Sequence, residues 1–425
     1  MTDLKEQGGD LVITGIGELA TPAGTTARRG KEMDNLKKVD DAAVVISGGR
    51  IVRAGPADQV MPDVQKLTCP LIDAEGGAVV PGFIDPHTHF VFAGDRADEF
   101  AWRLEGISYQ EIMSRGGGIV NTVKSTRTAS PRRLYELALK RLDDMLGMGV
   151  TTVEGKSGYG LDKETELFQL EVMQALNRDH PVDIVATFMG AHALPPKYEK
   201  EGRRSKEFID FLIEKVLPEV SERNLAEFCD VFCEEGAFSL EESRRILKAG
   251  RRRGLKPKIH ADEMTSLGGA ELAAEIEAVS AEHLLKVTEE GIDAMAKRDV
   301  TAVLLPLTAF SLREDYAPAR RLINKEVPVA LATDFNPGSS PTQSLPLLIA
   351  SACLYMDLTP AEALTGATLN AAAALDRAED RGSIEPGKRA DLLILKAPSY
   401  RHLPYRIGTN IVDRVIKDGR VVQEN

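Results

Sequence analysis

Two histidines separated by one residue are the first feature of this chain that could do chemistry. His87 and His89 follow an apolar, strand-like run and a turn at Pro81 and Gly82. Side chains alternate along an extended backbone, so both imidazoles face the same side and can bind one metal ion. A polar strand end explains an isolated pair of this kind equally well, so a metal site needs further ligands from elsewhere in the chain.

Two later apolar runs are each followed by a further candidate ligand. His260 comes directly after one run, and Asp334 follows another at residues 329–331. With the histidine pair, they offer three imidazoles and one carboxylate, a ligand set that suits zinc or iron(II). The sequence therefore predicts one divalent metal, zinc or iron, held by His87, His89, His260 and Asp334.

Two more polar residues could move protons at such a centre. Glu263 lies three residues after His260, close enough to face the metal without binding it. A carboxylate in that place can accept a proton from bound water and deliver it later. The alternative is that Glu263 caps the helix that follows. His283 ends another apolar run, and we expect it to hydrogen-bond the substrate or Asp334, the alternative being a buried structural histidine.

The middle of the chain must position these residues, and its pattern is regular. Apolar β-rich runs alternate with long helical patterns over roughly 300 residues, as in a (β/α)₈ barrel. The runs lie at residues 151–153, 184–187, 231–232, 258–259, 302–304 and 329–331. Active sites of such barrels lie at the carboxyl ends of the strands, where the candidate ligands fall. We therefore predict an α/β fold with a barrel over residues 81–387.

The two ends of the chain share a different texture. Short β-rich runs cut by glycines occupy residues 1–80, and similar runs return over residues 388–425. Such spacing is typical of a small sheet domain. We expect both ends to form one small β-sandwich domain beside the barrel, although the first forty residues contain an atypical stretch that fits no element.

Composition and charge exclude several classes of protein. The chain has 53 basic and 65 acidic residues and a net charge of −12, the wrong sign for binding nucleic acid or anionic membranes. Four scattered cysteines do not make a disulfide framework and fit a reducing cytosol. We find neither a secretory signal nor a membrane-spanning segment. A cytoplasmic enzyme with a small-molecule substrate is expected, with a homodimer as the default assembly.

The motifs around these residues resemble a known enzyme family. The run Pro81–His89, with His260, His283 and Asp334 downstream, resembles the amidohydrolase superfamily. More narrowly, the chain resembles the imidazolonepropionase family in its segments at residues 89–96, 116–119, 156–160, 190–196, 260–263 and 333–339. The resemblance covers nearly the whole chain after about residue 40. It implies hydrolysis of 4-imidazolone-5-propanoate to N-formimidoyl-L-glutamate in histidine degradation, with one zinc or iron ion.

The resemblance also implies a substrate pocket. Arg96 would hold the propanoate carboxylate in a bidentate pair, although an ion pair with its acidic neighbours is the alternative. Glu263, His283 and Asp334 would be the catalytic residues. The other substrate-binding residues would be Tyr159, His192, Asn336, Gly338 and Ser339, together with Glu263.

Three alternatives remain open at this point. A deaminase or cyclic-amide hydrolase acting on another heterocycle would share His260 and Glu263, but it would not need Arg96 for a carboxylate. A non-catalytic scaffold of the same fold would not need the ligand set. Lys156 follows a predicted strand, and as a carboxylated lysine it would bring a second metal; the surrounding Ser-Gly-Tyr-Gly motif argues against that role.

Overall fold

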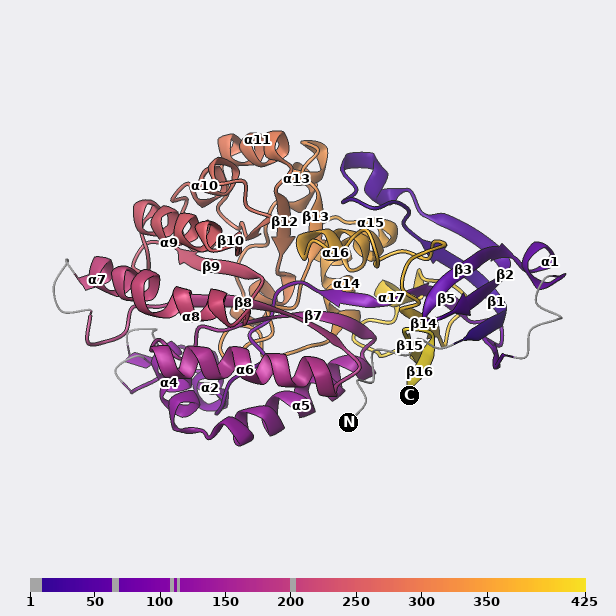
Figure 1. The fold of residues 1–425 in the computed structure, drawn as a ribbon. Helices are drawn as coiled ribbons and strands as arrows, with labels where there is room; N and C mark the ends of the chain where they lie inside the picture. Colours follow the sequence, from indigo (N-terminus) through magenta and orange to yellow (C-terminus); the bar gives the residue numbers. More distant parts are fainter. Residues whose placement is uncertain (1–9, 63–68, 108–110, 113–114, 199–203) are drawn as a thin grey trace.

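The computed structural model describes residues 10–62, 69–107, 111–112, 115–198 and 204–425, and it contains two eight-stranded sheets. The first nine residues of the predicted small domain therefore lie outside the described part. Figure 1 shows the larger sheet surrounded by helices and the smaller sheet at one side of it.

The larger sheet is the predicted barrel. Its strands are β6 (Phe83–Asp85), β7 (Val150–Lys156), β8 (Asp183–Ala191), β9 (Phe228–Cys233), β10 (Lys256–Ala261), β11 (Ser280–His283), β12 (Thr301–Leu304) and β13 (Val329–Leu331). Each strand pairs in parallel with the next in chain order. The two edge strands of this sheet, β6 and β13, approach each other. Just beyond them, the backbone amide of Asp334 donates a hydrogen bond to the carbonyl oxygen of His87 at 3.1 Å. This near closure brings the two most distant ligand segments together.

Helices follow the barrel strands and cover the outside of the sheet (Figure 1). Local sequence sets where they begin: Asp162 caps one of them, and Ser239 and Glu242 form a reciprocal capping box at another. The main helices are α2 (Ala97–Leu104), α4 (Ile119–Thr128), α5 (Pro131–Gly147), α6 (Lys163–Asp179), α7 (Arg204–Phe211), α8 (Leu217–Glu222), α9 (Leu240–Arg252), α10 (Gly269–Glu275), α11 (Glu289–Arg298), α12 (Pro306–Leu312), α13 (Ala319–Asn324), α14 (Leu345–Tyr355), α15 (Pro360–Gly366) and α16 (Leu369–Ala374).

The smaller sheet is mixed and joins both ends of the chain, as expected. Its strands are β1 (Leu11–Thr21), β2 (Lys37–Ser47), β3 (Arg50–Pro56), β4 (Leu71–Asp73), β5 (Ala78–Pro81), β14 (Leu392–Leu395), β15 (Val412–Lys417) and β16 (Arg420–Glu424). Strand β5 lies between β1 and β14, which joins the early and late segments. The unassigned stretch before residue 40 connects β1 to β2 and includes a short 3₁₀ helix at Gly30–Asp34. Only Gly82 separates β5 from the first barrel strand.

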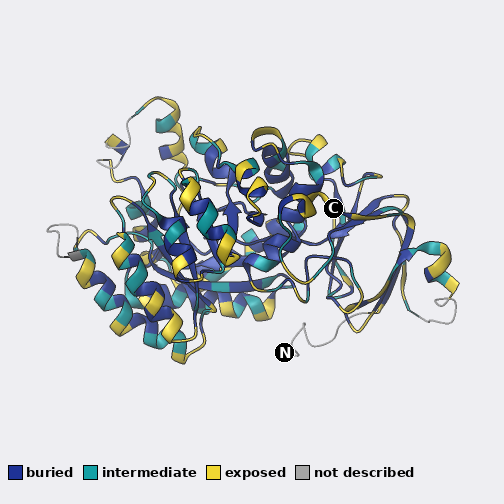
Figure 2. Cartoon of the chain, turned by 90° about the horizontal axis from the view of Figure 1, so that it is seen from above, coloured by how far each residue is buried: buried dark blue, intermediate teal, exposed yellow. Residues whose placement is uncertain are grey.

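The interior of the barrel and the layer between barrel and helices are the most buried parts of the molecule (Figure 2). The apolar run at residues 345–355 forms α14 and is mostly buried, as expected for a core helix. Within the described ranges, none of the helices combines the length and the apolar character needed to cross a bilayer. The cysteines, Cys69, Cys229, Cys233 and Cys353, are all free thiols.

Candidate metal centre

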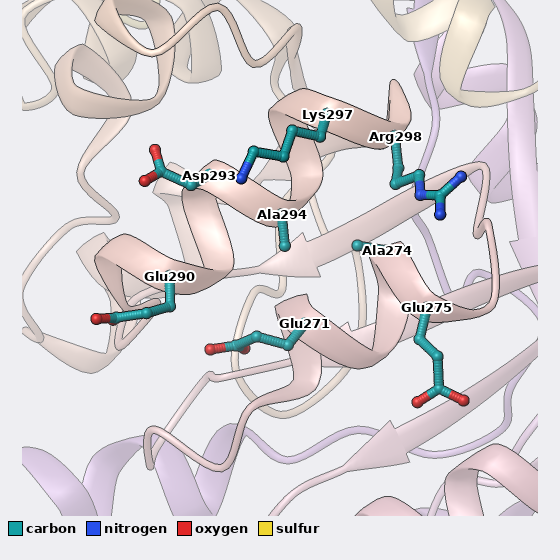
Figure 3. Close-up of a pocket in the computed structure, with 8 residues that line it drawn as sticks. All are labelled: Glu271, Ala274, Glu275, Glu290, Asp293, Ala294, Lys297 and Arg298. Atoms are coloured by element: carbon teal, nitrogen blue, oxygen red, sulfur yellow. The ribbon is translucent and has the colours of Figure 1, made fainter.

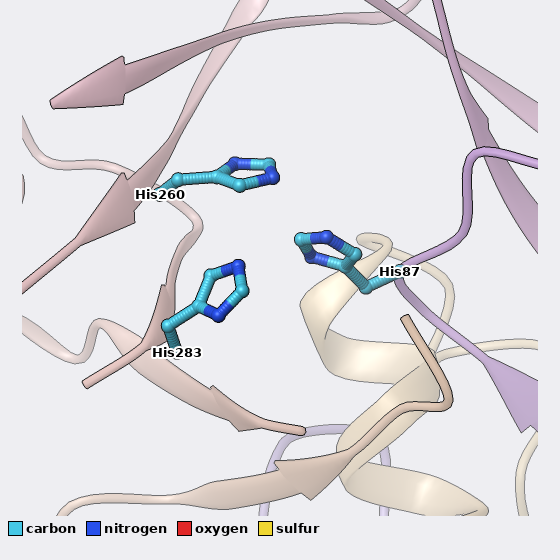
Figure 4. A group of neighbouring side chains, drawn as sticks. All are labelled: His87, His260 and His283. Carbon is cyan, nitrogen blue, oxygen red and sulfur yellow. The ribbon is translucent and has the colours of Figure 1, made fainter. Parts of the chain in front are cut away.

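Three imidazoles converge at the carboxyl ends of the barrel strands. His87 follows β6, His260 lies in β10 and His283 ends β11, and Figure 4 shows their rings turned toward a common space. The ring centroid of His87 lies 4.5 Å from that of His260 and 5.6 Å from that of His283. One nitrogen from each ring lies within 4.8 Å of the others, which is close enough to share an ion.

Asp334 joins this group from the opposite end of the barrel sheet. Its Oδ1 lies 3.4 Å from Nε2 of His87, and a second set of donor atoms within 4.8 Å of one another is that of His87, His89 and Asp334. Thr308 in α12 donates a hydrogen bond to the other oxygen, Oδ2, at 2.7 Å. The four predicted ligands thus fall in two sets that share His87, one with His89 and Asp334 and the other with His260 and His283.

The residues present fit a divalent cation. Nε2 of His87, Nε2 of His260 and Nδ1 of His89 are buried and make no hydrogen bond to any described residue. Unpartnered buried nitrogens cost free energy, and a bound metal would satisfy them. Burial by itself would lower the pKa of His87, but the nearby carboxylates of Glu282 and Asp334 together outweigh this and raise that pKa to about 9. The carboxylates around His87 therefore favour a positive charge at this position, as a bound metal ion would supply.

Two residues of the site have a strained backbone conformation. His283 and Asp334 have φ angles of 73° and 52°, in the left-handed region that residues with a Cβ seldom adopt. The strain is of order 1–3 kcal/mol at each residue and is typical of positions whose side chains must be aimed. Here both side chains point into the same buried space.

Glu263 has the properties of a group that exchanges protons. Its Oε1 lies 3.4 Å from Nδ1 of His283, and 16% of the side chain stays exposed. Burial, followed by repulsion from Asp334, raises the pKa of Glu263 to about 8. In contrast, burial and the neighbouring imidazoles hold the pKa of His283 at about 3, so His283 is neutral at physiological pH. A neutral imidazole can hydrogen-bond a substrate without competing with the metal for an anionic oxygen.

Aromatic rings form one wall beside the centre. His192 stacks on His89 with a centroid distance of 4.7 Å, and Tyr159 lies 5.3 Å from His192. Burial keeps the pKa of His192 at about 3, and it raises the pKa of Tyr159 further above its ordinary value. Both side chains are therefore neutral, which suits contacts to a flat heterocycle.

The other wall is formed by Arg96 and by the turn that follows Asp334. Asn336 Oδ1 accepts hydrogen bonds from the amides of Gly338 and Ser339, each at 2.8 Å. A Cβ at position 338 would lie 2.0 Å from Nη1 of Arg96, so a larger residue there would displace the guanidinium from the turn. Arg96 also pairs with Glu99 through Nε, at 2.9 Å, and through Nη2. The predicted pocket residues thus lie around the centre, although Arg96 also makes the local ion pair that was the alternative.

The interior of the barrel below the imidazoles contains charged residues that the sequence analysis did not assign. Lys156 Nζ lies 3.0 Å from Glu154, 2.7 Å from Asp230 and 2.9 Å from Glu282. These contacts suit a positively charged ammonium group. A carboxylated lysine would be anionic, and the three carboxylates would repel it. The signal that could have revealed this group is the presence of charged residues within otherwise apolar strands. Thr308 was also missed, because a threonine at the start of a helix has no distinctive pattern.

A surface pocket elsewhere on the molecule does not belong to this site. It lies between α10 and α11, and Figure 3 shows acidic side chains from both helices around it, with Lys297 and Arg298 at the end of α11. None of the predicted site residues lines it.

Comparisons with known proteins agree with this geometry. The amidohydrolase family model matches residues 78–422. The chain is 54% identical to the imidazolonepropionase of Clostridium tetani, over 97% of this chain and 98% of that protein. It is 52% identical to the imidazolonepropionase of Geobacillus kaustophilus, over 97% of each.

Solved structures show the same fold at low sequence identity. Aspergillus niger ochratoxinase superposes with a TM-score of 0.72 at 18% identity, covering 98% of this chain and 96% of that one. Guanine deaminase from C. acetobutylicum gives a TM-score of 0.71 at 16% identity, covering 98% and 100%. These structures share only the fold, because their sequence identity is low. The family is decided by the match to the family model and by the identity to the relatives. The chain belongs to the imidazolonepropionases of the amidohydrolase family.

Proposed function

We propose that this enzyme opens the ring of 4-imidazolone-5-propanoate by adding water, giving N-formimidoyl-L-glutamate. The water oxygen bonds to the ring carbonyl carbon, the bond from that carbon to the ring nitrogen breaks, and the nitrogen leaves with a proton. The observation that carries the proposal is the proximity of the predicted metal ligands and Glu263 at the strand ends, with Arg96 beside the turn that follows Asp334.

His87, His89, His260 and Asp334 would hold one zinc or iron ion. When bound, such an ion lowers the pKa of a water molecule and polarises a carbonyl group. Both metals accept three imidazoles and one carboxylate, so availability in the cell would decide between them.

Glu263 is the proton carrier in this proposal. As a carboxylate it accepts a proton from the attacking water, and as a carboxylic acid it returns that proton to the departing ring nitrogen. A pKa of about 8 suits both tasks, because the carboxylate and the carboxylic acid are both accessible near neutral pH. Asp334 shares the proton transfer, and neutral His283 donates a hydrogen bond to the substrate oxygen.

Arg96 recognises the propanoate arm. The substrate is anionic and the protein has a net charge of −12, so the pocket needs a local cation to attract it. Arg96 Nη1 faces Gly338, where a carboxylate would reach both the guanidinium and the turn. Tyr159 and His192 would pack against the ring, while Asn336 and Ser339 shape the turn. These contacts favour this substrate over heterocycles without a carboxylate arm.

We also propose that the enzyme works in the cytoplasm, without nucleic-acid or membrane partners, and that it is a homodimer. The free thiols and the acidic net charge support the first two statements. The third is the usual expectation for an enzyme of this size.

The decisive experiment mixes purified protein of known metal content with freshly generated imidazolonepropanoate. We expect ultraviolet loss of the substrate together with formation of formimidoylglutamate, both abolished in a chelated sample. A fully metal-loaded protein that does not accelerate the reaction would instead act on another heterocycle. A protein that binds no metal would support the scaffold alternative.

A further inference from the structure

We propose that the ammonium group of Lys156 occupies the place of a second cation, which limits the centre to one metal and orients two of its histidine ligands. The inference rests on the proposed metal centre but not on the identity of the substrate.

Five charged side chains fill the inside of the barrel below the imidazoles. They come from four strands and are fully buried: Glu154, Lys156, Asp230, Lys258 and Glu282. Charges in such a place must neutralise one another or a bound ion, because water cannot solvate them.

The ammonium stands where a cation would bind. The donor atoms of His87, Glu154 and Glu282 lie within 4.8 Å of one another, and so do those of Asp230, His260 and Glu282. Lys156 Nζ lies within 3.0 Å of a carboxylate oxygen in each set. A metal ion and this ammonium could not share those oxygens, because two cations would then be in contact.

Lys156 is protonated, and its positive charge is stabilised by its neighbours. Burial lowers the pKa of this ammonium, but Asp230, Glu154 and Glu282 outweigh it and raise that pKa above its ordinary value. Lys258 adds a second ammonium, 2.9 Å from Glu154 and 3.1 Å from Glu282. Lys156 is therefore a cation within the barrel, and Lys258 pairs with two of the same carboxylates.

The charge balance fits one divalent metal. The negative charges are four, and the lysines Lys156 and Lys258 contribute two positive charges. The four negative groups are the carboxylates of Glu154, Asp230, Glu282 and Asp334. The remaining −2 is matched by a single divalent ion bound to neutral imidazoles. Glu263 and Asp85 stand outside this group of paired charges, since Asp85 accepts hydrogen bonds from Thr333 and Glu263 lies beside His283.

The same carboxylates reach the metal ligands. Glu282 Oε2 lies 2.7 Å from Nδ1 of His87, and Asp230 Oδ2 lies 3.0 Å from Nδ1 of His260. These are ion-pair distances without hydrogen-bond geometry, and a carboxylate beside Nδ1 favours metal binding through Nε2. Lys156 holds both carboxylates, so it is a positioning residue for two ligands at once.

The test measures metal stoichiometry without substrate. Lys156→Ala removes the ammonium and leaves space among the carboxylates. We expect the wild-type protein to bind one equivalent of Co(II) at saturation and Lys156→Ala to bind two. In the variant loaded with Mn(II), electron paramagnetic resonance should show coupling between two ions. Lys417→Ala is the matched control, since Lys417 is an equally buried ammonium paired with Asp183 and Asp391 outside the centre.

Two results would overturn the proposal. One is a wild-type protein that takes up two equivalents of Co(II), and the other is a folded Lys156→Ala that still takes up only one. If the alanine variant does not fold, Lys156→Asn keeps a short polar side chain without the charge and carries the same expectation. Failure to hydrolyse imidazolonepropanoate would overturn only the proposed substrate, because the stoichiometry is measured without it.

Discussion

Thr308 donates a hydrogen bond from Oγ1 to Oδ2 of Asp334 at 2.7 Å, while Oδ1 of the same carboxylate faces His87. The threonine therefore decides which oxygen of Asp334 is free for the metal. It comes from α12, after β12, and not from the strand that carries the aspartate.

Replacing Thr308 by valine should weaken metal binding. The variant keeps the shape of the side chain but removes a charge-assisted hydrogen bond worth about 1.5–3 kcal/mol. Loss of a partner that orients a metal ligand typically lowers metal affinity about 10- to 100-fold. Competition with a chelator would measure this. Thr365→Val, which removes a buried hydrogen bond to the Met33 carbonyl, should leave the affinity unchanged.

Replacing Glu263 by glutamine should lower kcat by about 10²- to 10⁴-fold, the usual contribution of a positioned acid or base. The metal content should not change, because Glu263 is not one of the proposed ligands. Single-turnover kinetics on samples of measured metal content would check both statements. An unchanged kcat would eliminate Glu263 as the proton carrier.

The rate should depend on pH through Glu263. The carboxylate form accepts the first proton, so kcat/KM should rise with pH, with a midpoint at or below about 8, because the bound cation lowers the pKa. The rising limb should disappear in Glu263→Gln. A limb that persists unchanged in this variant would assign the titration to another group.

The stability of the metal-free protein should depend on the same group. The pKa of Glu263 is about 8 in the folded protein and lies near its ordinary value of 4.5 in the unfolded chain. The folded state therefore binds the proton more tightly, and this stabilisation is complete below about pH 4.5 and lost as pH rises to about 8. Unfolding by denaturant should show a smaller fall in free energy over this range for Glu263→Gln than for wild type.

Replacing Arg96 by alanine should lower kcat/KM by about 10- to 100-fold, as expected for loss of a charge-assisted pair of about 1.5–3 kcal/mol. Gly338→Ala should act in the same direction, because its Cβ would collide with Arg96 Nη1. An analogue whose carboxylate is replaced by a primary amide should be affected much less. Equal losses for both compounds would show that Arg96 does not recognise the carboxylate.

The linear sequence contains enough information for the barrel, the small sheet and the four proposed ligands. Each predicted strand run falls inside an observed barrel strand, because apolar runs between helical patterns can be buried in only a few ways. The four proposed ligands could be selected because three imidazoles and one carboxylate follow separate apolar runs: His87, His89, His260 and Asp334. The spacing of short strands likewise assigned both chain ends to one small domain, and the structure places their strands in one sheet.

The surroundings of those ligands were decided only by the tertiary structure. Lys156, Asp230 and Glu282 are separated by long stretches of sequence, and no local pattern states that their charges meet inside the barrel. The contact of Thr308 with Asp334 and the crossing of Arg96 over Gly338 also depend on how neighbouring strand ends are spaced. Local sequence sets which side chains are available, whereas the distances that set charge, orientation and pKa arise only when the barrel closes.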